Sequence, residues 1–207
     1  MICKEEGPMN RKLFIFDVGG VIVLHAPTIK EFCQRYQLDP RSVNSDWRAY
    51  IKPMLDGFLP VTQFYKALEA KYGIDLSNDN IMLTCYHPAT NHGMKKIVAM
   101  LRENGHRVVT GSNTFNVHWD YLKSLDPSPL SGFDHLYASH EMHLSKPDVQ
   151  FYQYIMKAEG FEPQDSFMID DFEINLQAPR SIGMECFCYH DNDQELLTLL
   201  KEKGYIG

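Results

Sequence analysis

The sequence lacks long apolar runs and an excess of basic residues. No stretch approaches the roughly 18 consecutive apolar residues that a membrane-spanning helix needs. The 20 lysines and arginines are outnumbered by 27 acids, so the formal net charge is −7, which argues against nucleic acid or an anionic membrane as the main partner. An acidic protein can still bind phosphate locally, because a lysine, a metal ion or a helix N-terminus supplies positive potential.

Cysteine is scarce and irregularly placed. The five cysteines are an odd number without a regular spacing, which suits a reduced cytoplasmic protein better than a secreted one held by disulfides. The first eight residues are too polar for a signal peptide, and we expect residues 1–10 to form a loose N-terminal tail. We therefore expect a cytoplasmic protein, and the oligomeric state stays open.

A carboxylate follows the first apolar run of the chain. Residues 13–16 are apolar and rich in strand formers, and Asp17 comes directly after them, followed by Val18, Gly19 and Gly20. Such a run predicts a central strand of a parallel sheet, and ligands of open α/β sheets gather at the carboxyl ends of strands. Asp17 is therefore a candidate functional residue, although a turn or cap aspartate would give the same local pattern.

Three later segments carry polar groups of the kinds that this carboxylate would need as partners. They are the strand at 108–112 with Ser112 and Asn113 at its end, Lys146 before a helix expected to start at Pro147, and the strand at 167–169 that ends in Asp170 and Asp171. Each segment also has an interpretation without a functional role. A lysine before a proline is usually a surface residue, and the other groups could cap helices or form turns. The four segments point to one site only when they are taken together.

The four motifs, in this order, resemble those of the haloacid dehalogenase superfamily of hydrolases. Most members are Mg²⁺-dependent phosphatases that pass through an aspartyl-phosphate. The resemblance runs from about residue 13 to about residue 190 and is closest to the bacterial glucose-1-phosphate phosphatases and the N-terminal phosphatase domain of soluble epoxide hydrolase. It implies a small phosphomonoester as substrate, with sugar phosphates expected first and mononucleotides or other small esters second.

The resemblance also implies roles for the metal-binding residues. Asp17 would be the nucleophile and would bind Mg²⁺ together with the backbone carbonyl of Gly19 and with Asp171, while Asp170 would contact the ion directly or indirectly. Mg²⁺ prefers hard oxygen ligands and commonly binds through one or two carboxylates and the substrate phosphate. Asp171 is favoured over Asp170 as the direct ligand.

Three further residues would bind the phosphoryl group by the same resemblance. Lys146 would hold Asp17 and the phosphoryl oxygens together and oppose the charge that develops during transfer. Ser112 would cradle these oxygens with its hydroxyl and with the amides of the following helix. Asn113 would contribute a side-chain or backbone donor.

The residue two positions after Asp17 departs from the usual pattern. Most phosphatases of this superfamily carry a second aspartate there as general acid and base, whereas this chain has Gly19. A positioned acid or base contributes typically about 10²- to 10⁴-fold. The leaving group could be acidic enough to need little help, as in a sugar 1-phosphate. Alternatively, His25 could bind the substrate and replace the missing aspartate as the acid. As a third alternative, the chain could have lost catalysis and kept phosphate binding.

Hydrophobic periodicity predicts an α/β fold with an inserted helical cap. The 207 residues, 44% of them hydrophobic, suffice for one domain and an insertion. Residues 28–88 show helical periodicity without an apolar strand, and the resemblance identifies them as a cap that selects the substrate. Residues 11–27 and 89–207 alternate between helix and strand patterns, which predicts a doubly wound, Rossmann-like parallel sheet. Residues 140–143 are expected to be a loop approaching Lys146.

Two alternative functions stay open. Metal-independent 2-haloacid dehalogenases of the same superfamily also have Ser-Asn after the second strand, but they do not require the acidic pair Asp170 and Asp171. A catalytically silent protein that binds a phosphate ligand would have no use for the nucleophile Asp17. Both alternatives are therefore less favoured than a Mg²⁺-dependent phosphatase.

Overall fold

The apolar segments pair into one parallel sheet. The computed structural model describes residues 11–24 and 27–207, and within these the sheet has five strands in the order β5-β4-β1-β6-β7. The strands are β1 (Leu13–Phe16), β4 (Arg107–Ser112), β5 (His135–Ala138), β6 (Ser166–Asp170) and β7 (Glu185–Cys188). The α/β class and the parallel sheet predicted from the sequence are confirmed.

Helices cover both faces of this sheet. All four side chains of β1 are fully buried; Phe14 and Phe16 belong to one hydrophobic cluster, and Leu13 and Ile15 to another. Such burial on both faces explains why a strand of a parallel sheet is apolar throughout instead of alternating. One face is covered by α5 (His92–Glu103), α6 (Asn116–Ser124) and α10 (Asp193–Glu202), and the other by α8 (Val149–Glu159) and α9 (Glu173–Ser181).

The central position of β1 brings the motifs together. Phe16, its last residue, is in register with Thr110 of β4 and with Ile169 of β6. Because all three strands run parallel, the residues that follow them emerge at the same edge of the sheet. The backbone N–H of Asp17 continues the pairing and donates to the carbonyl of Ile169 over 2.8 Å.

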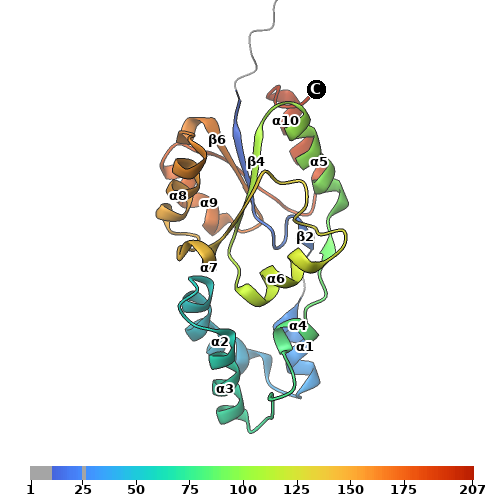
Figure 1. Cartoon of the computed structure of the whole chain (residues 1–207), viewed down its shortest axis with the longest axis vertical. Helices are drawn as coiled ribbons and strands as arrows, with labels where there is room; N and C mark the ends of the chain where they lie inside the picture. The colour runs from blue at the N-terminus through green and yellow to red at the C-terminus, as the bar shows by residue number, and fades with distance from the viewer. Residues whose placement is uncertain (1–10, 25–26) are drawn as a thin grey trace, which may run out of the picture.

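A helical cap lies beyond this edge of the sheet (Figure 1). Its helices are α1 (Thr28–Arg35), α2 (Pro40–Leu55), α3 (Val61–Tyr72) and α4 (Ile81–Thr84). They pack around a separate hydrophobic cluster, to which Phe115 of the core segment also belongs. Cap and sheet are joined by an antiparallel pair that the sequence did not indicate, β2 (Val23–Leu24) with β3 (Ala89–Thr90). None of the helices in the described part of the chain is long and apolar enough to cross a membrane.

The cap docks on the core through a tight turn after α2. His143 contacts the backbone carbonyl of Asp56 through Nδ1 at 2.9 Å, and its ring stacks on Phe58 with the centroids 5.1 Å apart. The expectation of a loop at 140–143 is wrong, because Ser139–Met142 form the short helix α7 and His143 ends it in a left-handed conformation. Likewise, α8 starts at Val149 rather than at the proline before it, with Asp148 as N-cap.

Gly57 provides a test of this docking. Its φ is +72°, and a Cβ at this position would collide with the backbone carbonyl of His140. We expect Gly57→Ala to lower the free energy of unfolding by about 2–4 kcal/mol, because strain in the left-handed region adds to the clash. Gly73→Ala is the control, since Gly73 has φ +65° but open space around a Cβ, and should cost only about 1–2 kcal/mol. Denaturant titrations measure both losses. An equal loss of unfolding free energy in the two variants would contradict the importance of the contact between Gly57 and His140.

Candidate active site

The motif side chains meet at the carboxyl edge of the sheet. Lys146 Nζ lies 3.0 Å from Asp17 Oδ1 and 2.6 Å from Asp170 Oδ2. Carboxylate oxygens of Asp17, Asp170 and Asp171 all lie within 4.8 Å of one another. Asp17, Lys146 and Asp170 are buried, so the alternative of a solvated surface lysine is wrong. The cluster combines a carboxylate nucleophile candidate with a cation and two further acids.

Three hydrogen bonds from residues nearby in the sequence orient the acids at the strand ends. The N–H of Val18 donates to Asp17 Oδ1 over 2.6 Å. Asp170 Oδ1 accepts from the N–H of Phe172 over 2.8 Å and from Asn175 Nδ2 over 3.0 Å. Asn175 is not among the site residues predicted from the sequence, although its position on the first turn of α9, five residues after Asp170, brings its amide back to the strand end. Asp170 is thus held from two sides.

The side-chain amide of Asn113 forms two hydrogen bonds with the backbone of Lys146. Its Nδ2 donates to the Lys146 carbonyl over 2.9 Å, and its Oδ1 accepts from the Lys146 N–H over 2.8 Å. Asn113 is predicted to contribute a side-chain or backbone donor to the phosphoryl group, and in the structure its side-chain amide is engaged with the backbone of Lys146. Neither Ser112 nor Asn113 caps α6, whose N-cap is Phe115 without a side-chain hydrogen bond. Ser112 is buried and lines a small cavity together with Gly19 and Asn113.

The electrostatics of the cluster favour a bound cation. Burial raises the pKa of Asp17 to about 8; Lys146 opposes this shift, and the charges of Asp170 and Asp171 add to it. Burial by itself would lower the pKa of Lys146, but the two neighbouring carboxylates outweigh it and raise the pKa. Three carboxylates therefore share one ammonium. The donor set fits Mg²⁺, which prefers hard oxygen ligands such as carboxylates.

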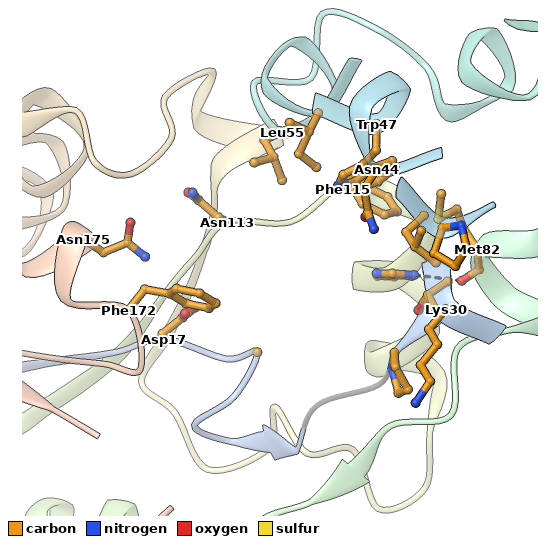
Figure 2. A pocket seen from close by; sticks show the side chains of 17 residues that line it. Asp17, Lys30, Asn44, Trp47, Leu55, Met82, Asn113, Phe115, Phe172 and Asn175 are labelled. Carbon is orange, nitrogen blue, oxygen red and sulfur yellow. Dashed lines mark hydrogen bonds between the residues drawn. The ribbon is translucent and has the colours of Figure 1, made fainter. Parts of the chain in front are cut away.

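A cavity of about 700 Å³ opens between this cluster and the cap. Asp17, Asn113, Phe172 and Asn175 lie on its core side (Figure 2). Cap residues, among them Trp47, lie opposite. The cavity is large enough for a small substrate, since ligand pockets commonly span about 300–1,000 Å³.

Gly19 lies at the rim of this cavity and has room for a side chain. It is exposed, its φ is not in the left-handed region, and a Cβ built on it meets nothing within 4 Å. A side chain can therefore begin at this position without a clash at its Cβ. His25, the sequence-based candidate for a substitute acid, lies outside the described residues.

His118 is a cavity residue that the sequence analysis did not single out. Its ring stacks on Tyr86 with the centroids 3.8 Å apart, and its Nε2 donates to the carbonyl of Met82 over 2.8 Å. Burial lowers its pKa to about 4, so the ring is neutral at physiological pH. It joins the core helix α6 to the cap helix α4, and a single histidine on a helix carries no sequence signal for such a role.

Comparisons with known proteins identify the family of the chain. The family model described as haloacid dehalogenase-like hydrolase matches residues 11–183. D-ribitol-5-phosphate phosphatase from Bacteroides thetaiotaomicron is 23% identical over 186 residues, 85% of this chain and 90% of that protein. Drimenol cyclase from Aspergillus calidoustus is 22% identical over 188 residues. The match to the cyclase covers 88% of this chain but only 35% of that protein, so the chain spans about a third of it.

Solved structures share the fold. A HAD family enzyme from Bacteroides thetaiotaomicron superposes with a TM-score of 0.78 at 21% identity, over 92% of this chain and 99% of that one. Its complex with magnesium and inorganic phosphate has a TM-score of 0.75 at 20% identity, over 90% and 98%. L-2-haloacid dehalogenase from Xanthobacter autotrophicus has a TM-score of 0.64 at 17% identity, over 95% and 84%.

The low pKa of His118 predicts a pH-dependent stability. Its pKa lies at about 4 in the folded chain against 6.5 for an ordinary histidine, so the unfolded chain takes up the proton first as the pH falls. The stabilisation is complete above about pH 6.5 and is lost toward pH 4, a total of about 3 kcal/mol. We expect His118→Gln, which keeps a donor, to flatten this part of the stability profile in denaturant titrations. The exposed His92→Gln is the control and should leave the slope unchanged.

Proposed function

Because the chain belongs to the haloacid dehalogenase-like hydrolases, we propose that it is a Mg²⁺-dependent phosphatase of small phosphomonoesters that acts through an aspartyl-phosphate on Asp17. The observation that carries the proposal is the buried cluster in which Lys146 lies 3.0 Å from Asp17 and three carboxylates come within 4.8 Å of one another. A nucleophilic carboxylate can approach a phosphate dianion only where cations neutralise both.

The chain's own residues perform the transfer. An oxygen of Asp17 forms a bond to phosphorus while the ester oxygen leaves on the opposite side with its bonding electrons. Lys146 offsets the charge on the phosphoryl oxygens, and Ser112 donates to them from the end of β4. Water then attacks the phosphorus of the aspartyl-phosphate, the bond to Asp17 breaks, and inorganic phosphate is released. One proton of this water balances the proton that the departed ester oxygen takes up from solvent to become the alcohol.

Mg²⁺ supplies the remaining positive charge when it is bound. Its ligands in this proposal are Asp17, the backbone carbonyl of Gly19 and Asp171, with Asp170 in the supporting position. The hydrogen bonds that Asp170 accepts from Lys146, Phe172 and Asn175 favour Asp171 as the direct ligand, because they already occupy lone pairs of Asp170.

The acidic cluster favours the phosphatase over the two alternatives. A metal-independent dehalogenase has no need of three carboxylates around one lysine. A silent binding protein has no need of a buried nucleophile next to a phosphate-binding lysine. Sugar phosphates remain the ester class expected from the sequence, and the relative that acts on D-ribitol 5-phosphate supports that expectation. The four described cysteines are free thiols, in line with a proposed cytoplasmic location.

Phosphate release tests the proposed reaction. With Mg²⁺ present, we expect inorganic phosphate from a panel of phosphomonoesters and none after addition of a chelator. Asp17→Asn should lower kcat by about 10³-fold or more, because it removes the nucleophile. Asp120→Asn changes an exposed aspartate of α6 and should retain activity. Phosphate release that persists with the chelator or in Asp17→Asn would contradict the proposal.

Restoring the missing acid tests the role of Gly19. Because the position has room for a side chain, Gly19→Asp should fold normally and raise kcat/KM by about 10²- to 10⁴-fold on a sugar 6-phosphate. The gain on the corresponding 1-phosphate should be smaller, since its leaving oxygen is more acidic. Gly19→Asn is the isosteric control without a transferable proton, and an equal gain in it would refute the leaving-group explanation.

A further inference from the structure

We infer that Asn113 is a positioning residue, whose side chain acts on the reaction through Lys146 and not by contact with the phosphate. The inference rests on the proposed phosphatase function and adds a residue to it. Two observations carry it. Both polar atoms of the Asn113 side chain are bonded to the backbone of Lys146, and Lys146 Nζ lies 3.0 Å from the proposed nucleophile Asp17.

The two hydrogen bonds fix which way the amide of Asn113 is turned. Its Nδ2 donates to the carbonyl of Lys146 and its Oδ1 accepts from the N–H of the same residue. Turning the amide over would set donor against donor and acceptor against acceptor. Asn113 lies on the core side of the cavity, as Asp17 does (Figure 2). A phosphoryl group at Asp17 would therefore meet an amide that is already oriented toward Lys146.

Lys146 needs a fixed backbone because its charge stands on a flexible side chain. The ammonium is carried by a four-carbon stem with free rotation, and Lys146 belongs to the loop between α7 and α8. Asp17 and Asp170 hold the Nζ end of this side chain. Asn113 holds the backbone end. The position of the charge is defined because both ends are held.

A small displacement of this charge is sufficient to slow the reaction. The side chain of Lys146 is fully buried, at 0% exposure, so its position depends on these protein contacts. A misplacement of about 1 Å in a reacting group can cost about 10²-fold in rate. Loss of the two hydrogen bonds from Asn113 therefore affects the transfer even though the amide does not touch the phosphate.

Ser139 makes a contact of the same kind that does not involve Lys146. Its Oγ donates to the carbonyl of Thr114 over 3.0 Å and accepts from the N–H of Thr114 over 3.0 Å. Ser139 is fully buried, and Thr114 directly follows Asn113 in the chain. Ser139→Ala therefore removes two hydrogen bonds from the same loop and is the matched control for a purely structural effect.

Single substitutions test whether Asn113 acts on the rate. In the full chain with Mg²⁺, we expect Asn113→Ala to lower kcat for para-nitrophenyl phosphate by about 10- to 100-fold. Asn113→Ser keeps a hydroxyl donor that is too short to join both groups of Lys146, and it should lose as much as the alanine. Ser139→Ala should keep kcat within about twofold, although denaturant titrations should show a similar loss of unfolding free energy in Ser139→Ala and Asn113→Ala.

A second substitution tests whether the effect passes through the lysine. Lys146→Arg keeps a cation but moves its charge to a guanidinium of different shape, so the native position of the ammonium is already lost. Residues that act through one another give non-additive losses, whereas independent contacts add. We expect Asn113→Ala to cost at most about threefold further in the Lys146→Arg chain. Ser139→Ala should have the same small effect in both chains.

The outcomes separate the inference from the function on which it rests. A loss from Asn113→Ala that is as large in the Lys146→Arg chain as in the native chain, or native activity in Asn113→Ser, would show that the side chain serves the phosphate directly. An unchanged kcat in Asn113→Ala, or an equal loss in Ser139→Ala, would show a structural contact only. Each of these results would overturn the inference and leave the phosphatase standing.

A different result would overturn both. If the native chain with Mg²⁺ releases no phosphate from para-nitrophenyl phosphate or from D-ribitol 5-phosphate, the proposed function fails and the inference fails with it.

Discussion

The buried ammonium of Lys146 is the interaction on which the site depends. It lies within hydrogen-bonding distance of Asp17 and Asp170, two acids from adjacent strands that would repel each other in its absence. Loss of one partner of a buried ion pair costs about 3–5 kcal/mol, because the remaining charge stays buried and uncompensated. The ammonium thus joins the ends of β1 and β6 and also places the positive charge that a phosphoryl group requires. The contact of Lys146 with the two acids therefore contributes both to the stability of the fold and to the proposed chemistry.

In the proposed function the core supplies the reactive residues and the cap supplies the selectivity. Asp17 and Asp170 stand at strand ends of a sheet that is buried on both faces, and the packing of the sheet fixes where they lie. The cap contributes hydrocarbon and aromatic walls, such as Trp47 and Leu55, to the same cavity. The cap contacts the core where the turn at Gly57 approaches the backbone of His140 and where His118 donates to the carbonyl of Met82. A phosphate bound at the acids would therefore leave the rest of its ester among cap side chains, where the substrate is selected.

Much of the candidate site could be predicted because its reactive residues follow apolar strands directly. Asp17 and Asp170 are recognisable from the strands before them, and parallel strands necessarily end at one edge. Asn113 was harder to interpret, because its partner is the backbone of a residue 33 positions later. His118 carried no signal, since its low pKa arises from burial between cap and core rather than from neighbouring residues. The cap turn and the ribbon of β2 and β3 were likewise missed, because short elements lack periodicity.

The sequence by itself determined the strands, the helical insertion, the order of the motifs and the family. These follow from local periodicity and from residue types at fixed spacing, which need no knowledge of what packs against them. Only the tertiary structure decided that Asn113 holds Lys146, that Phe172 lies beside Asp17, and that much of the cavity wall is apolar. Those features depend on which helix faces which strand end, a property of the whole packed chain and not of any segment within it.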